Sequence, residues 1–145
     1  MNQKEIHSAS APKPVGLYPH ARQVGDFLFL SGVGPREPGT DKIAGLELGP
    51  RGEILRYDFE AQCHSVFKNV RMILESSGAS WGDLVDVTIY LIDMKRDFAT
   101  FNKIYAEYFK DIPAKPCRTT LGITSLPTPI AIELKCMAYL PQKKA

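Results

Sequence analysis

The apolar residues of this chain switch repeatedly between the two-residue period of β-strands and the 3.6-residue period of α-helices, and this alternation limits the fold more than any other feature. One stretch of helical spacing begins after a candidate cap at Asp58 and ends at Gly78. A second helical pattern follows a candidate cap at Asp97. Strand patterns flank both helices, at residues 22–24, 27–31, 85–93, 117–124 and 130–140.

With a short strand near residues 54–57, the order is β-β-(β)-α-β-α-β-β, which predicts an α+β fold with a mixed sheet and two helices packed on one face. We expect residues 22–24 and 27–31 to form a hairpin whose second strand is buried on both faces. Residues 117–124 and 130–140 are candidate antiparallel neighbours around SLPTP. The other face of the sheet carries mostly apolar or small residues, so we expect it to meet another subunit.

The length of 145 residues and the hydrophobic content of 44% suit a single domain over residues 1–145. Residues 1–20 are polar and contain prolines, which predicts an extended N-terminal arm. Residues 36–53 are rich in glycine, proline and charge, which predicts a long loop that bears on substrate choice more than on folding.

Several classes of protein are disfavoured by composition. A net charge of +2 without a clustered basic stripe argues against a dedicated nucleic-acid binder, and no apolar run approaches the roughly 20 residues of a membrane helix. The first residues lack the apolar core of a signal peptide, so we expect a cytoplasmic protein. Cys63, Cys117 and Cys136 are scattered and share no ligand spacing with the histidines, so we expect reduced thiols and neither a metal site nor a cofactor.

Two charged residues lie inside predicted strands. The permanent charge of Arg118 requires an anionic partner or water. The anionic partner is either a neighbouring carboxylate of the protein or the carboxylate of a substrate, which two parallel N–H donors would hold. If the last two strands pair, Glu133 can share a face with Arg118. The two residues then either neutralise each other or place a water-orienting carboxylate beside a bound anion, as a hydrolytic deamination requires.

Three polar residues have both a structural and a functional interpretation. Asn102 lies on or beside the buried face of the second helix, where its amide makes a helix-to-strand hydrogen bond or faces a ligand or subunit boundary. Tyr18 is an anchor for the arm or a ring over a site. Ser31 precedes a glycine and can offer its hydroxyl to a ligand, but it lacks the G-x-S-x-G context of a nucleophile.

Three segments of the chain resemble the reactive intermediate deaminase family, also called the YjgF or RidA family. They are VGLYPHARQVGDFLFLSGVGP, DFATFNKIYAEYF and PCRTTLGITSLPTPIAIELKCMAYLP. The resemblance covers about residues 10–140. The family signature in the last segment consists of Pro116, Arg118, Leu126, Pro127, Glu133 and Ala138. The resemblance implies a chorismate-mutase-like fold and a homotrimer with sites in clefts between subunits.

The resemblance also implies roles for individual residues. Arg118 would hold the carboxylate of a small-molecule substrate, and Glu133 would position the attacking water. The residues implied to line the substrate site are Tyr18, Ser31, Gly32, Asn102, Arg118 and Thr120. Thr120 stands where many members have cysteine, so any thiol role at that position is absent.

Three features are similar to the 2-aminomuconate deaminase branch of the family, which acts in the degradation of aromatic compounds. They are the long loop at residues 36–53 and the segments GVGPR and MKRDFATFN. The implied reaction converts 2-aminomuconate and water into 2-oxo-3-hexenedioate (4-oxalocrotonate) and ammonia without a cofactor. Alternatives are a generalist that hydrolyses 2-iminopropanoate, a ribonuclease or translation inhibitor, and a trimeric interaction protein in which Arg118 and Glu133 form an ion pair. A second substrate carboxylate would need another cation, for which the candidates are His20, Arg22, Arg36 and Arg51.

Overall fold

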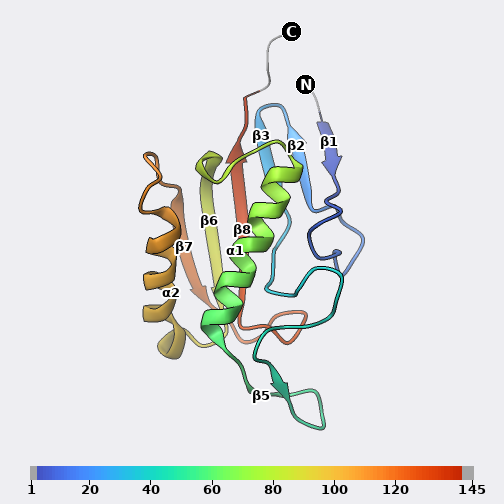
Figure 1. Cartoon of the computed structure of the whole chain (residues 1–145), viewed down its shortest axis with the longest axis vertical. Helices are drawn as coiled ribbons and strands as arrows, with labels where there is room; N and C mark the ends of the chain where they lie inside the picture. The colour runs from blue at the N-terminus through green and yellow to red at the C-terminus, as the bar shows by residue number, and fades with distance from the viewer. Residues whose placement is uncertain (1–2, 142–145) are drawn as a thin grey trace.

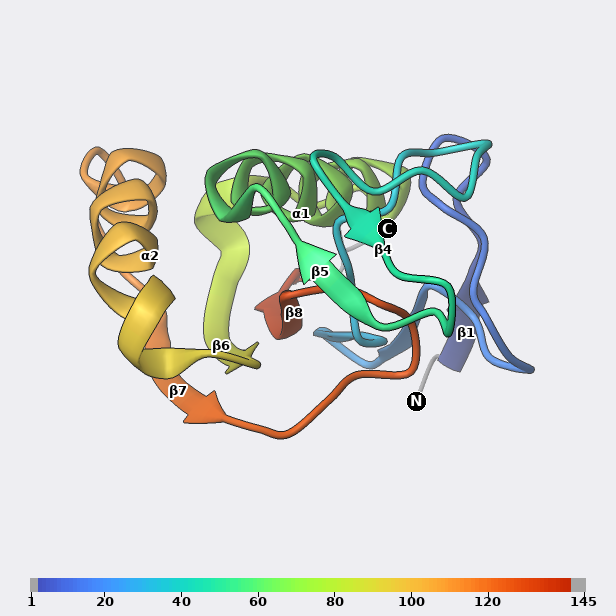
Figure 2. The same ribbon diagram turned by 90° about the horizontal axis from the view of Figure 1, so that it is seen from below.

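The computed structural model describes residues 3–141, and it confirms an α+β fold in which two helices cover one face of a mixed sheet (Figures 1 and 2). The strands are β1 (Gln3–Ile6), β2 (Ala21–Val24), β3 (Phe27–Leu30), β4 (Glu47–Leu48), β5 (Ile54–Arg56), β6 (Leu84–Leu91), β7 (Cys117–Gly122) and β8 (Ile132–Tyr139). The helices are α1 (Phe59–Ser76), the short 3-10 helix η1 (Trp81–Asp83) and α2 (Met94–Phe109). None of the helices in the described part of the chain is long and apolar enough to cross a membrane.

Six strands form the main sheet in the order β1-β2-β3-β8-β6-β7. The expected pairing of the last two strands is wrong, because β6 lies between β7 and β8. Strand β7 returns from α2 and pairs parallel to β6, as a strand–helix–strand crossover requires. Strand β8 then pairs antiparallel with both β3 and β6, which places it near the middle of the sheet.

The predicted cap of the first helix is confirmed, and that of the second is wrong. The Asp58 carboxylate accepts a hydrogen bond from the Ala61 backbone N–H at 3.0 Å. The second helix is instead capped by Asp93, which accepts from the Arg96 backbone N–H at 3.1 Å. Asp97 is buried in the first turn, where it accepts a hydrogen bond from the Tyr57 hydroxyl at 2.5 Å. Its carboxylate therefore attaches α2 to the segment before α1 rather than capping the helix.

Of the arm expected over residues 1–20, residues 1–2 lie outside the described part, residues 3–6 join the sheet as the edge strand β1, and the rest runs through several bends. His20 fastens the rest of the arm, because its Nδ1 accepts from the Ser8 backbone N–H at 3.0 Å and its Nε2 lies 2.8 Å from the Pro12 carbonyl oxygen. The loop at 36–53 contains the short strand β4, which pairs with β5 in a small ribbon at one end of the molecule (Figure 1).

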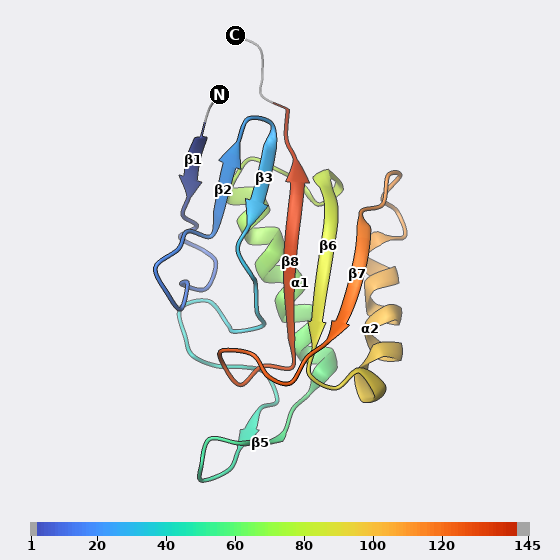
Figure 3. The same cartoon turned by 180° about the vertical axis from the view of Figure 1, so that it is seen from behind.

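Strand β3 is buried on one face only, which corrects the expectation of burial on both faces. Leu28 and Leu30 are fully buried, whereas Phe27 and Phe29 are 44% and 39% exposed. Figure 3 shows that the sheet face opposite the helices is bare along its whole width. Tyr139 pairs with Phe27 on this face, with the two ring centroids 5.5 Å apart. The chain therefore presents large apolar side chains on an uncovered sheet surface.

Candidate active site

Four of the residues selected from the sequence line one pocket. Tyr18 comes from the arm, Ser31 and Gly32 follow β3, and Glu133 lies near the start of β8. The pocket has a volume of about 90 Å³. The antiparallel pairing of β3 with β8 brings the end of one strand beside the beginning of the other, so the fold itself assembles these residues.

Gly32 permits the carboxylate of Glu133 to lie against the backbone after β3. A Cβ atom added at Gly32 would lie 2.6 Å from Oε1 of Glu133, which is closer than real Cβ contacts allow. Burial raises the pKa of the Glu133 carboxyl. Within residues 3–141 this carboxylate makes no hydrogen bond or ion pair, so it is available to a ligand or a water molecule.

We therefore expect Gly32→Ala to impair activity by displacing the Glu133 carboxylate. The matched control is Gly82→Ala, because a Cβ atom at Gly82 would have nothing within 4 Å. Steady-state ammonia release and thermal melting should be measured for both variants. We expect a loss on the order of tenfold or more in kcat/KM for Gly32→Ala, which corresponds to about 1.4 kcal/mol of lost transition-state stabilisation. Equal activity of the two variants would contradict a role for the close approach.

Arg118 projects from β7 onto α2. Its Nη2 donates to Oδ1 of Asn102 at 2.6 Å, and its guanidinium carbon lies 4.9 Å from the ring centroid of Tyr105 and 5.3 Å from that of Phe101. Aromatic faces attract a guanidinium and restrict its orientation. No carboxylate pairs with Arg118 within the described residues, so the salt-bridge interpretation is wrong there. Several of its five N–H donors remain for an anion.

Asn102 and Thr120 belong with Arg118 rather than with the pocket. The helix-to-strand interpretation of Asn102 is confirmed, since its amide oxygen holds the guanidinium. Thr120 lies two residues after Arg118 on β7 and therefore faces the same way. Its hydroxyl oxygen is buried and makes no hydrogen bond within residues 3–141. These three residues form a polar group at the β7 edge of the sheet.

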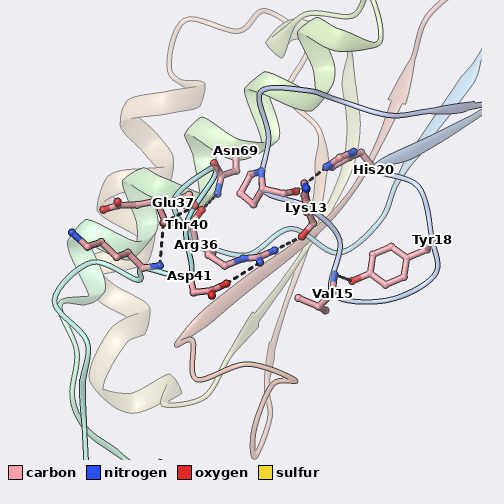
Figure 4. A network of polar contacts seen from close by, with 11 residues as sticks. Lys13, Val15, Tyr18, His20, Arg36, Glu37, Thr40, Asp41 and Asn69 are labelled. Atoms are coloured by element: carbon pink, nitrogen blue, oxygen red, sulfur yellow. Dashed lines mark hydrogen bonds and ion pairs between the residues drawn. The ribbon is translucent and has the colours of Figure 1, made fainter.

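Tyr18 and Ser31 shape the pocket wall. The Ser31 hydroxyl donates to the Pro19 carbonyl oxygen at 2.7 Å, which fixes the arm against the end of β3. The Tyr18 hydroxyl accepts from the Val15 backbone N–H at 3.3 Å, which closes a tight loop of the arm (Figure 4). Both hydroxyl groups thus hold the pocket in shape, and each oxygen keeps a lone pair for a ligand.

The expectation that Arg118 and Glu133 share a face is wrong within one chain. Arg118 is in register with Val87, which is fully buried beneath the helices. Glu133 is in register with Tyr90, and Tyr90 with Leu121, on the uncovered face. Strands β7 and β8 are also separated by β6, which adds about 10 Å across the sheet. One chain therefore holds the two charged groups on opposite faces.

Asn69, which no sequence motif indicated, supports the pocket from α1. Its side-chain Nδ2 donates to the Gly34 carbonyl at 2.9 Å and to the Arg36 carbonyl at 2.8 Å (Figure 4). The signal was an amide on the apolar face of the helix, beside Val66 and Val70, where a buried polar group must find partners. Among residues 3–141, no group of three or more histidine, cysteine, aspartate or glutamate side chains is placed to hold a metal ion.

Comparison with known proteins places the chain in a family. The Ribonuc_L-PSP family model, described as endoribonuclease L-PSP, matches residues 8–140. The chain belongs to this family. It is 39% identical over 139 residues to a RutC family protein of Pyrococcus abyssi, which covers 96% of this chain and 98% of that protein.

Another member of the family carries the name of an enzyme. The chain is 37% identical over 140 residues to Reactive Intermediate Deaminase A, chloroplastic, of Arabidopsis thaliana, which covers 95% of this chain and 67% of that protein. The crystal structure of Escherichia coli TdcF with bound serine superposes with a TM-score of 0.79 at 28% identity, covering 94% of this chain and 98% of that chain. The expected YjgF and RidA membership and fold are thereby confirmed.

Proposed function

We propose that this member of the family is a hydrolytic deaminase of enamine and imine acids that uses no cofactor. The observation that carries the proposal is the half-buried, unpartnered carboxylate of Glu133 inside a pocket. A carboxyl group whose pKa is raised toward neutrality transfers protons more readily near pH 7 than an ordinary glutamate does. The deaminase name of the Arabidopsis relative supports the same class of reaction.

In the proposed mechanism, the enamine first tautomerises to an imine. Arg118 binds the carboxylate next to the C=N carbon, and Glu133 orients a water molecule and accepts its proton as the oxygen adds to that carbon. The proton then passes from Glu133 to the amine nitrogen of the carbinolamine. The C–N bond breaks as the hydroxyl group loses its proton and the C=O bond forms, which releases the keto acid and ammonia. A protonated imine carbon is already electrophilic, so orientation and one proton relay supply most of what the reaction needs.

Because one chain holds Arg118 and Glu133 on opposite faces of its sheet, we propose that the site is completed between subunits of a homotrimer. In this arrangement the β7 edge of one subunit, with Asn102 and Thr120, would lie against the pocket of its neighbour. Two observations support the arrangement. The guanidinium and the carboxylate each lack an ionic partner within residues 3–141, and the bare sheet face exposes large apolar side chains among charged ones such as Arg22 and Lys135. Such a face is typical of a subunit interface.

Phe29→Glu should dissociate the trimer, because it replaces a large apolar side chain on the uncovered sheet face with a charged one. Leu48→Glu is the matched control, since Leu48 is 44% exposed on the β4–β5 ribbon and Phe29 is 39% exposed on the sheet. Sedimentation velocity should show a trimer for the wild type and Leu48→Glu and a smaller species for Phe29→Glu. Ammonia release should fall together with the trimer. A fully active monomer would contradict a site shared between subunits.

For the substrate, we propose 2-aminomuconate, with 2-oxo-3-hexenedioate and ammonia as products. The alternative is a generalist that acts on 2-iminopropanoate. Serine, which E. coli TdcF binds, carries a carboxylate next to its amine-bearing carbon, as both candidate substrates do. Both candidates use the same Arg118 and Glu133 chemistry, so the family alone does not separate them.

The decisive experiment adds the purified protein to enzymatically generated 2-aminomuconate and, separately, to 2-iminopropanoate. Ammonia release is measured against the spontaneous rate, with heat-inactivated protein as control. Acceleration of both reactions supports the deaminase class, and the ratio of kcat/KM values identifies the preferred substrate. Failure to accelerate either reaction would refute the proposal.

The endoribonuclease description of the family model makes RNA a useful additional substrate in that experiment. A net charge of +2 provides little electrostatic attraction for a polyanion. We expect no cleavage of a single-stranded RNA under conditions in which ammonia is released.

A further inference from the structure

The deaminase proposal leaves two cations of the pocket, Lys13 and Arg36, without a role, and Lys13 is exposed on the arm. The side chain of Arg36 lines the same pocket as Gly32 and Glu133, and it is 22% exposed. Glu133 is the only carboxylate among the described residues that line this pocket. A partly buried guanidinium beside the space for a substrate is suited to binding a second anionic group.

The contacts of Arg36 hold it in place without neutralising it. Its Nη2 donates to the Lys13 carbonyl, and its Nη1 lies 3.8 Å from Oδ1 of Asp41, whose side chain is fully exposed (Figure 4). An ion pair at that distance with an exposed carboxylate is weak. Asn69 fixes the backbone by donating to the Arg36 carbonyl. Most of the five guanidinium donors are therefore left for a ligand.

The other cations considered for this role are engaged or lie elsewhere. Both ring nitrogens of His20 are occupied by backbone groups of the arm. Arg22 is exposed on β2 and donates to the Gln3 side chain. Arg51 lies at the exposed turn between β4 and β5. Of these three, only His20 lines the pocket.

We propose that Arg36 binds a second carboxylate at the end of the substrate distant from Arg118, and so selects dicarboxylic enamine and imine acids. This proposal rests on the proposed function, because Arg118 and Glu133 define the reacting end of the substrate. The turn at residues 36–43 places Asp41 beside Arg36, where an incoming carboxylate can replace it.

The binding test uses two unreactive ligands of equal chain length, trans,trans-muconate with two carboxylates and sorbate with one. We expect calorimetry to show that wild-type protein binds muconate at least tenfold more tightly than sorbate. Arg36→Met should abolish most of that ratio and leave the affinity for sorbate within about twofold, because only the distant carboxylate loses its partner. The matched control is Arg51→Met, which should behave as wild type.

A second variant, which keeps Arg36, tests the proposal even if Arg36→Met does not fold. Asp41→Asn removes the exposed carboxylate that competes for the guanidinium, so it should raise the ratio of muconate to sorbate affinity. A ratio unchanged in Asp41→Asn and in folded Arg36→Met overturns the proposal. Equal weakening of both ligands in Arg36→Met also overturns it, because Arg36 would then only tie the arm to the loop.

Ammonia release separates this proposal from the deaminase proposal. An Arg36-dependent preference for muconate without any ammonia release would support the second carboxylate site and refute the deaminase function. Ammonia release from 2-aminomuconate, with unchanged binding of muconate and sorbate in Arg36→Met, would support the deaminase function and refute the second carboxylate site. If both proposals hold, Arg36→Met should lower kcat/KM at least tenfold for 2-aminomuconate and leave that for 2-iminopropanoate within twofold.

Discussion

Arg118→Lys should lose nearly as much activity as Arg118→Ala. Lysine keeps the positive charge, but it offers a compact donor on a different stem and cannot present two parallel N–H groups to a planar carboxylate. It would also lose the geometry of the contact with Asn102 and of the stacking near Tyr105. Charged hydrogen bonds contribute about 1.5 to 3 kcal/mol each, so kcat/KM should fall on the order of tenfold to a hundredfold, with a further loss from misorientation.

The measurement is steady-state ammonia release from the preferred substrate, with circular dichroism to establish that the variants are folded. Arg51→Lys makes the same chemical change at the exposed β4–β5 turn and should keep full activity. Near-normal turnover of a folded Arg118→Lys protein would show that Arg118 does not act as a two-pronged donor to a carboxylate.

Glu133→Gln should lower kcat by about a hundredfold or more with a smaller effect on KM, because it removes a proton acceptor but no substrate anchor. Burial raises the pKa of this carboxyl, so in the wild type kcat should fall as the pH drops through that raised pKa and the carboxylate becomes protonated. Glutamine does not titrate, so the acid limb of the kcat profile assigned to Glu133 should vanish. An unchanged acid limb in the variant would contradict the assignment.

Stability provides an independent readout for the same variant. The pKa of Glu133 is higher in the folded chain than in the unfolded chain, so its contribution to stability is present below the unfolded pKa and is lost as the pH rises through the folded pKa. Glu133→Gln should therefore melt at the same temperature as the wild type or higher at pH 7. Any difference should shrink on acidification. A structural ion pair would have the opposite effect, because its removal lowers stability at neutral pH.

Local chemistry made much of the fold predictable. The helix beginning after Asp58 could be located because its carboxylate caps the first turn, and Gly78 ends the segment with φ of +81°. The second cap was misassigned by four residues because Asp93 and Asp97 are both acceptable caps by residue type. Only the tertiary contact with Tyr57 decided that Asp97 would be buried.

The membership of the candidate site was also accessible from sequence, whereas its division into two groups was not. Gly32 and Glu133 were singled out, and the structure brings them into contact. Arg118 and Asn102 were singled out as well, and they are hydrogen-bonded to each other. Arg118 and Glu133 lie on opposite faces because they are in register with Val87 and Tyr90 of β6, the strand that separates β7 from β8. A single sequence does not encode strand order in any local pattern, because pairing is set by long-range packing.

By itself, the sequence determined the fold class, the family and the residue types available for chemistry, because periodicity, capping and motif residues are local properties of the chain. The tertiary structure alone decided which strand lies between Arg118 and Glu133 and which of the candidate arginines lines the pocket. By residue type alone, nothing distinguishes Arg22, Arg36 and Arg51 as partners for a second carboxylate. Only the packing of the arm, the loop and α1 brings Arg36 into the same pocket as Glu133, because proximity between distant segments arises from the burial of their shared surfaces.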